Sequence, residues 1–243
     1  MRTAHEIAHG KALSQRDTER LWGWGTPAGR LRARRRAEMI IAGSRLSPGM
    51  RVLEIGCGTG MFTELFAQAG SHIIAVDISV DLLESAKTRN LAVNQVTFLE
   101  KPFEECDVEG PFDAIIGSSI LHHLEIEVAL SKIHSLLKPG RYMSFAEPNM
   151  LNPQVFMERK LKFLPWYSYV SLDETAFVRW KLKKLLLKTG FDNVEISPYD
   201  WLHPSTPQSM IPFVHRMGQL MEKIPFLCEF AGSLYIRCRR PLQ

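Results

Sequence analysis

A glycine-rich segment at residues 52–60, VLEIGCGTG, is well suited to hold a ligand against the backbone. A strand-like apolar run leads directly into Gly56, Gly58 and Gly60, and a helical pattern begins near Met61. Glycine has no Cβ and adopts conformations that other residues avoid, so a ligand can lie close to the main chain. The free N–H groups of the following helix favour an anionic group. The segment therefore predicts a site for an anion or a nucleoside.

An aspartate closes the second apolar run, about twenty residues after Gly56. A carboxylate at the place of Asp77 can accept hydrogen bonds from both ribose hydroxyls. The spacing Gly-x-Gly-x-Gly differs from the dinucleotide pattern Gly-x-Gly-x-x-Gly, which needs a glycine where Met61 stands. The loop and the acid together favour an adenosine-type ligand, and NAD is a less favoured alternative.

Two adjacent histidines, His122 and His123, follow the fourth apolar run, at the edge where open α/β sheets bind their ligands. A neutral imidazole can take a proton from a hydroxyl or an activated carbon. Either histidine is therefore a candidate general base. The alternative is that both side chains cap or pack the loop.

An alternation of strand-like and helical patterns must position these groups. Strands are predicted at 51–55, 72–77, 96–99, 112–117 and 142–146, and helices at 60–69, 80–90 and 125–137. The strands are almost continuously apolar, which is typical of a parallel sheet covered by helices on both faces. A further helix at 173–189 and strands at 194–198 and 233–239 extend this α/β sheet to seven strands.

The composition sets limits on the class of protein. The chain has 243 residues, of which 45% are hydrophobic and 23% charged, and a formal net charge of +4. These values indicate a globular protein and exclude collagen-like and disordered classes. The four cysteines, Cys57, Cys106, Cys228 and Cys238, form no C-x-x-C pair, so no metal site is predicted. No signal peptide or transmembrane segment is predicted, which favours a cytoplasmic location, and peripheral membrane contact stays open.

These motifs resemble those of the class I S-adenosylmethionine-dependent methyltransferases, in the small-molecule branch known as methyltransferase type 11. The similar segments are VLEIGCGTG, VDIS with Asp77, FDAIIGSSILHHL and LLKPGRYMSFAEPN, which together cover about residues 50–150. The resemblance implies a Rossmann-like, mostly parallel sheet of order 3-2-1-4-5-7-6. It also implies one domain over residues 1–243, with a helical N-terminal appendage at 1–49, a cofactor-binding core at 50–150, and a substrate-side insertion with the last two strands at 151–243.

The resemblance assigns roles in binding S-adenosylmethionine, whose product is S-adenosylhomocysteine. Gly56, Gly58 and Gly60 would back the methionine and ribose, Glu54 would brace the loop, and Asp77 would hold the ribose diol. Ile78 and Leu82 would contact adenine, Phe103 would offer its backbone N–H to it, and Ser118 would line the methionine side. The family's acid after the third strand is replaced here by Lys101-Pro102, so that adenine contact is not expected.

The flanking segments are expected to select the methyl acceptor. Trp22, Trp24, Trp166, Tyr167 and Tyr169 can form a lid over an apolar acceptor, or pin the flanking segments to the core. Arg30 and Arg34 can reach a carboxylate, or lie on a solvated helix face. Residues 207–230 combine methionine and phenylalanine with few charges, so they predict a lipid-like contact, a membrane contact or a packed insertion.

The resemblance predicts transfer of a methyl group to oxygen or carbon of a small molecule, with an aromatic or lipid-like acceptor as the first expectation. Residues 118–121 lack the Asn/Asp-Pro-Pro-Tyr tetrad of nucleobase N-methyltransferases, so no nucleic-acid substrate is expected. The alternatives are a non-catalytic S-adenosylmethionine-binding sensor or scaffold protein, and an NAD-dependent oxidoreductase. The sequence makes no prediction of the oligomeric state or the identity of the acceptor.

Overall fold

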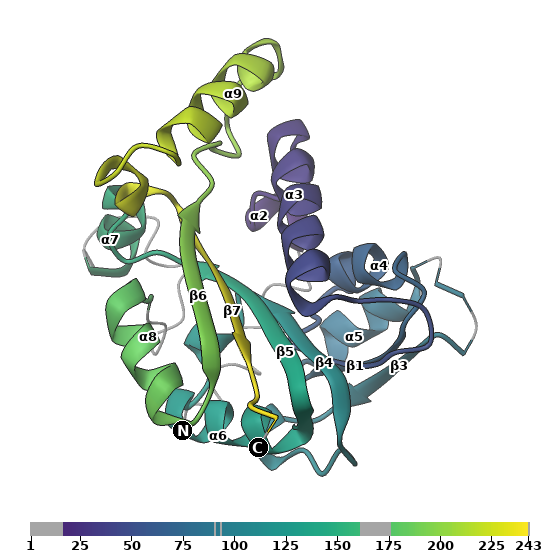
Figure 1. Cartoon of the computed structure of the whole chain (residues 1–243). Helices are drawn as coiled ribbons and strands as arrows, with labels where there is room; N and C mark the ends of the chain where they lie inside the picture. Colours follow the sequence, from purple (N-terminus) through teal and green to yellow (C-terminus); the bar gives the residue numbers. More distant parts are fainter. Residues whose placement is uncertain (1–16, 90, 93, 161–175, 243) are drawn as a thin grey trace.

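The computed structural model describes residues 17–242 except 90, 93 and 161–175 (Figure 1). Within this part the chain forms a seven-stranded sheet of order β3-β2-β1-β4-β5-β7-β6. The strands are β1 Arg51–Ile55, β2 His72–Asp77, β3 Val96–Glu100, β4 Phe112–Ser118, β5 Leu137–Pro148, β6 Asp192–Tyr199 and β7 Ser233–Arg239. The first five strands pair in parallel, and β7 is antiparallel to both β5 and β6. The predicted α/β class and strand order are confirmed.

Helices cover both faces of the sheet, as predicted. They are α2 Thr18–Leu21, α3 Pro27–Ser44, α4 Met61–Ala67, α5 Val80–Lys87, α6 Ile126–Leu136, α7 Pro153–Lys160, α8 Arg179–Lys188 and α9 Ile211–Met221, and short 3-10 turns include η1 Phe103–Glu105, η2 Leu121–His123 and η5 Leu227–Phe230. The alternation of side chains along each central strand explains the two layers, because Leu53 and Ile55 enter one cluster while Val52 enters the other.

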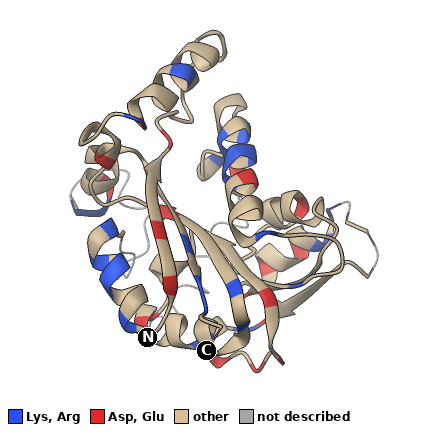
Figure 2. Cartoon of the chain, in the orientation of Figure 1, with Lys and Arg blue, Asp and Glu red and all other residues tan. Residues whose placement is uncertain are grey.

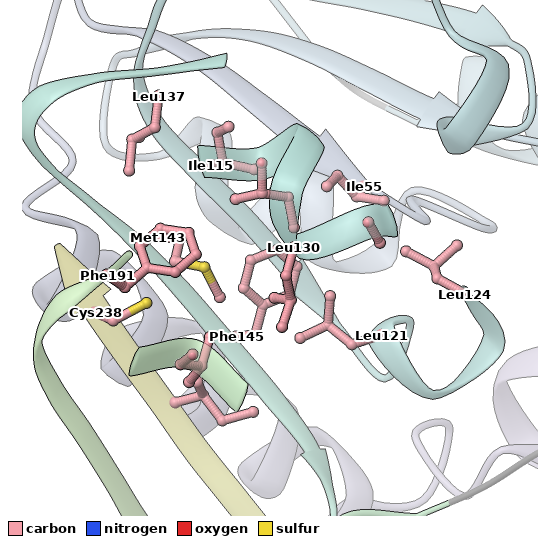
Figure 3. Close-up of a cluster of buried hydrophobic side chains, with 14 of the residues drawn as sticks. Ile55, Ile115, Leu121, Leu124, Leu130, Leu137, Met143, Phe145, Phe191 and Cys238 are labelled. Atoms are coloured by element: carbon pink, nitrogen blue, oxygen red, sulfur yellow. The ribbon is translucent and has the colours of Figure 1, made fainter. Parts of the chain in front are cut away.

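The first layer lies between the sheet and helices α6 and α8. Figure 3 shows Ile55, Ile115, Met143 and Phe145 of the strands packed with Leu130 of α6, and all five side chains are fully buried or nearly so. The second layer packs helices α3, α4 and α5 on the opposite face. Each buried Leu, Ile or Phe contributes roughly 1.5–3 kcal/mol, so these two layers hold the sheet edge in place.

The N-terminal appendage contributes a long helix to the second layer. Helix α3 begins at Pro27, and the hydroxyl of Thr26 caps it by accepting a hydrogen bond from the N–H of Gly29 at 3.0 Å. The break between α2 and α3 is therefore confined to residues 22–26. Gly43 lets α3 lie directly on the sheet, since a Cβ there would come within 1.7 Å of the Tyr235 hydroxyl.

Two predicted boundaries need correction. Strand β5 starts at Leu137, whereas Lys138-Pro139-Gly140 was predicted to end a helix and the strand to begin at Tyr142. A shift in register between Phe112 and Ala114 of β4 accommodates this early start. Helix α8 starts at Arg179, and most of the predicted segment 173–178 lies outside the described residues or in extended structure.

Candidate functional site

The glycine loop after β1 takes left-handed backbone conformations at Gly56, Gly58 and Gly60, with φ of 70°, 52° and 74°. Residues with a Cβ adopt this conformation at a cost, so the spacing of glycines follows from the path of the loop. A Cβ on Gly58 would lie 3.4 Å from the ring of Trp22. A Cβ on Gly60 would lie 2.9 Å from that of Ala86, so Gly60 serves the packing of α4 on α5.

A cavity of about 950 Å³ opens at the carboxyl ends of β1, β2, β3 and β4. It is lined by Gly56, Gly58, Asp77, Ile78, Leu82, Phe103 and Ser118, all of which the sequence predicted to bind the cofactor. Gly60 and Glu54, which were predicted with them, are not part of its lining. Because parallel strands end at one edge, residues far apart in the sequence meet around a single space.

Asp77 braces the loop from the end of β2. Its Oδ2 accepts a hydrogen bond from the N–H of Gly58 at 2.7 Å, and its Oδ1 accepts one from the N–H of Ser79 at 2.9 Å. Burial raises the pKa of Asp77, and these backbone donors partly offset the effect. Each carboxylate oxygen can accept a further hydrogen bond, so the group can also hold a ligand hydroxyl.

Glu54 lies on β1 beneath the loop and is 1% exposed. Burial raises the pKa of this carboxyl to about 8, and the charge of Asp77 adds to the increase while the Thr63 hydroxyl opposes it. Glu54 therefore carries a proton at neutral pH in the ligand-free fold.

The two predicted histidines lie in η2, and both line the cavity. Nδ1 of His122 lies 2.6 Å from Oε2 of Glu147, which is fully buried on β5. The other oxygen of Glu147 accepts the N–H groups of Ile120 and Leu121, both at 2.9 Å. Burial raises the pKa of Glu147, and the two backbone donors partly offset the effect. The carboxylate thus fixes both the loop and the orientation of the imidazole, and the sequence analysis had not assigned it a role.

Arg36 is a second residue that the sequence analysis missed. Its guanidinium is 3% exposed and lies 4.8 Å from the ring centroid of Trp24. It donates hydrogen bonds to Ser119 at 2.7 Å, to Ser118 at 3.2 Å and to Ser233 at 2.7 Å. Its Nε is buried and has no hydrogen-bond partner among the described residues. Its hydrogen-bond partners are neutral hydroxyls, and the buried carboxyl of Glu147 is near enough for its charge to interact with that of Arg36.

The helical spacing of α3 could have predicted that Arg36 is buried. Ala33, Ala37 and Ile40 are buried on one face, and Arg36 falls on that face between them. The predicted carboxylate contacts, Arg30 and Arg34, are instead exposed and do not line the cavity. Arg30 donates a hydrogen bond to the Gly25 carbonyl at 2.7 Å.

Two of the five predicted lid residues can be placed. Trp22 and Trp24 line the cavity, and Trp24 packs edge-on against Phe62 with ring centroids 5.4 Å apart. Glu19 of α2 fastens this segment across the glycine loop, since it accepts a hydrogen bond from the Thr59 hydroxyl at 3.2 Å and pairs with Arg89. Trp166, Tyr167 and Tyr169 lie outside the described residues.

The comparison with known proteins agrees with this fold. A family profile described as a methyltransferase domain matches residues 52–140. An uncharacterised methyltransferase from Synechocystis sp. is 34% identical over 152 residues, which cover 60% of this chain and 68% of that protein. A ubiquinone biosynthesis O-methyltransferase from Xanthomonas campestris pv. campestris is 35% identical over 97 residues, or 38% of this chain and 41% of that protein. The chain spans about half or less of the length of such relatives.

Solved structures share the architecture over nearly the whole chain. The N-methyltransferase NodS from Bradyrhizobium japonicum, solved with S-adenosylhomocysteine, has a TM-score of 0.64 at 17% identity and covers 97% of this chain and 98% of that one. The chain belongs to the class I S-adenosylmethionine-dependent methyltransferases, a family whose methyl donor is S-adenosylmethionine.

The residues around the cavity fit this cofactor. Its adenosine matches the apolar side chains of Ile78 and Leu82 and the acceptor oxygens of Asp77. The hydroxyls of Ser118 and Ser119 lie on the cavity wall and can reach the carboxylate of the methionine part, while Arg36, which holds both hydroxyls, lies behind them and outside the lining. At the place of the missing acid, Pro102 lines the cavity, while the Glu104 carboxylate accepts the N–H of Glu125 at 3.0 Å.

No group of three or more His, Cys, Asp or Glu side chains suited to a metal ion occurs among the residues described. No helix in the described part of the chain is long and apolar enough to cross a membrane.

Proposed function

We propose that this protein transfers a methyl group from S-adenosylmethionine to an oxygen or carbon atom of a small-molecule acceptor, and that His122 is the general base. The observation that carries the proposal is the buried His122–Glu147 pair on the wall of the cavity that fits the cofactor. A protein that only binds the nucleoside has no use for an imidazole held in this way.

The bound cofactor supplies a methyl group that is already electrophilic. The protein's task is therefore to align the acceptor, a positioning effect that contributes up to roughly 7–11 kcal/mol. Glu147 accepts the Nδ1 proton of His122 and leaves Nε2 as the basic nitrogen. His122 then takes the proton of an acceptor hydroxyl, and the carboxylate of Glu147 stabilises the imidazolium that forms. Trp22 and Trp24 cover the cavity and exclude water.

The acceptor is an aromatic or lipid-like molecule in this proposal. The cavity falls in the upper part of the size range of ligand pockets, which leaves room for an acceptor beside the cofactor. Apolar groups from several elements line it, including Trp22, Phe62 and Phe103. Relatives named ubiquinone biosynthesis O-methyltransferases match over 38% and 53% of the chain and are consistent with oxygen as the target.

The test is transfer of a labelled methyl group from S-adenosylmethionine into fractionated cell extract, with wild type compared to Asp77→Ala and His122→Gln. We expect label in a small-molecule or lipid fraction for wild type and a loss of at least about 100-fold for His122→Gln. Label in nucleic acid or protein would contradict the acceptor class. Binding of S-adenosylhomocysteine without label in any fraction would favour a non-catalytic sensor.

A further inference from the structure

Helix α9 is apolar on two opposite faces. Ile211, Val214 and Gly218 form the inner face, where Ile211 and Val214 pack with residues of α3 and Gly218 lies against Trp201. The outer face carries Phe213, Met217 and Leu220, spaced at i, i+4 and i+7, and all three are exposed, Phe213 by 65%. The apolar part of α9 is thus wider than the face that the core covers, while His215, Arg216 and Gln219 lie on its polar side. Figure 1 shows α9 extending away from the sheet, and among the described residues nothing covers its outer face.

The exposed apolar face continues beyond the helix into the turn before η5. Ile224 is half exposed and Phe226 is 85% exposed. The backbone of Phe226 has a left-handed conformation with φ of 66°, which is unfavourable for a bulky residue. A large aromatic ring is thus held in solvent at a conformational cost. Scattered exposed side chains are ordinary on protein surfaces, but a continuous set of this kind marks an interaction site.

A cationic helix adjoins this apolar surface. Helix α8, with the sequence RWKLKKLLLK, contains no acidic residue, and Figure 2 shows Lys and Arg positions in several places along its length. Trp180, Lys184 and Leu187 follow one another at i, i+4 and i+7 on its exposed side, with Lys181 and Lys183 beside them. Among the described residues these three lysines have no carboxylate partner. The ion pair between Arg179 and Glu229, at 2.6 Å, joins the start of α8 to η5.

Positive charge is concentrated in the C-terminal part of the chain, which contains α8 and α9. Residues 151–243 contain thirteen Lys and Arg against eight Asp and Glu, although the whole chain has a net charge of only +4. On α9 and the turn that follows it, the cations Arg216 and Lys223 flank the apolar face, and Glu222 is turned inward to Arg35. Exposed aromatic and aliphatic groups bordered by lysines match the interface of an anionic bilayer.

We propose that the outer face of α9, the turn at Ile224–Phe226 and the exposed side of α8, together called the α8–α9 surface, dock this protein on a membrane that contains anionic phospholipid. Phe213, Met217, Leu220 and Phe226 enter the boundary between headgroups and acyl chains, and the lysines of α8 contact the headgroups. Nucleic acid would satisfy the lysines but would leave the aliphatic stripe of α9 in water.

The docked surface adjoins the cavity. Helix α7 contributes Glu158 and Arg159 to the lining, and Asn152, just before α7, donates a hydrogen bond to the carbonyl of Phe230 in η5 at 2.8 Å. An apolar acceptor dissolved in the bilayer would therefore reach the cavity without crossing water. This last step rests on the proposed function, whereas the docking does not.

Co-sedimentation with vesicles tests the docking directly. The full chain is mixed with vesicles of phosphatidylcholine alone, or with about 30% phosphatidylglycerol, at low and high salt. We expect binding only to the anionic vesicles, weakened by salt. The double variants Phe213→Ser with Phe226→Ser, and Lys181→Glu with Lys184→Glu, each weaken binding about tenfold or more.

Matched controls separate this surface from exposed apolar or charged residues in general. Leu242→Ser and Lys87→Glu change an exposed leucine and an exposed lysine away from α8 and α9, and they leave vesicle binding as in wild type. Thermal melting and binding of S-adenosylhomocysteine establish that every variant is folded, independently of methyl transfer.

Three results would overturn the proposal. One is the absence of sedimentation with anionic vesicles, and another is equal sedimentation of wild type and both double variants. The third is that the same residues mediate self-association or RNA binding while vesicles are not bound.

Discussion

Asp77 holds the glycine loop by accepting backbone hydrogen bonds, and we expect the same carboxylate to bind the ribose of the cofactor. Replacing it with Ala removes the charge-assisted hydrogen bonds, each of which contributes about 1.5–3 kcal/mol. We expect Asp77→Ala to weaken binding of S-adenosylhomocysteine by at least about tenfold in calorimetry. Asp81→Ala, on the exposed side of α5, is the control. Unchanged affinity in the Asp77 variant would show that the cofactor binds elsewhere.

In the proposed function Glu147 acts through His122, and the variant Glu147→Gln would separate this role from its bonds to the backbone. Gln retains an oxygen for the N–H groups of Ile120 and Leu121 but removes the negative charge from His122. We expect kcat to fall about 100-fold while the affinity for S-adenosylhomocysteine stays within a factor of about two. Steady-state kinetics and calorimetry measure the two quantities. Wild-type turnover in Glu147→Gln would leave His122 with a purely structural role.

Glu54 makes the stability of the ligand-free protein depend on pH. Its folded pKa of about 8 lies above the ordinary value, so between about pH 5 and pH 8 the folded state binds more protons than the unfolded state. The free energy of unfolding must then fall as the pH rises through this interval, by an amount on the order of a few kcal/mol. Glu54→Gln is nearly isosteric and does not titrate.

Urea denaturation of wild type and Glu54→Gln at several pH values isolates this contribution, because Asp77 and Glu147 titrate in both proteins. We expect the difference in stability between the two to grow toward pH 8, with the variant favoured. Parallel curves would mean that Glu54 has an ordinary pKa in the fold.

Among the elements, helix α3 can pack closely on the sheet because residue 43 is glycine and has no Cβ. Gly43→Ala would bring a Cβ within 1.7 Å of the Tyr235 hydroxyl and 2.9 Å of the Ser144 hydroxyl. We expect a loss of about 1–3 kcal/mol in urea denaturation, although alanine is the better helix former. Adding Tyr235→Phe to Gly43→Ala should recover part of the loss. An increase in stability for Gly43→Ala would mean that α3 lies farther from β7.

The sequence predicted best those elements whose residue pattern is visible within a short stretch of the chain. Each central strand is a continuous apolar run, and the glycine loop and Asp77 lie at strand ends that the pattern marks directly. Strand β5 was predicted too short because Pro139-Gly140 normally ends an element. Here Leu137 pairs with Phe112 of β4, and Gly140 and Arg141 exchange backbone hydrogen bonds with Arg240, far away in the sequence. Arg36 and Glu147 were missed because their partners, Ser119 and His122, come from other elements that only the folded sheet brings near.

Ligand binding should stabilise the whole molecule, because the cavity joins α2, four strand ends and α7. At about one hundred times its dissociation constant, S-adenosylhomocysteine adds roughly 2.7 kcal/mol to the free energy of unfolding. For a chain of this length we expect Tm to rise by about 5–10 °C, which differential scanning fluorimetry can measure. The same concentration should have a much smaller effect on Asp77→Ala. A rise of equal size with NAD would point to a different nucleotide specificity.

The short helix α2 sets the order of events in a catalytic cycle. Glu19 joins α2 to Thr59 and Arg89 on the far side of the glycine loop, and Trp22 lies over Gly58. A nucleoside seated on that loop would lie under Trp22, so we expect it to leave more slowly while the contacts of Glu19 hold α2 in place. We therefore expect the partly buried Glu19–Arg89 ion pair to lengthen the residence time of S-adenosylhomocysteine, and Glu19→Gln to shorten it in stopped-flow release measurements.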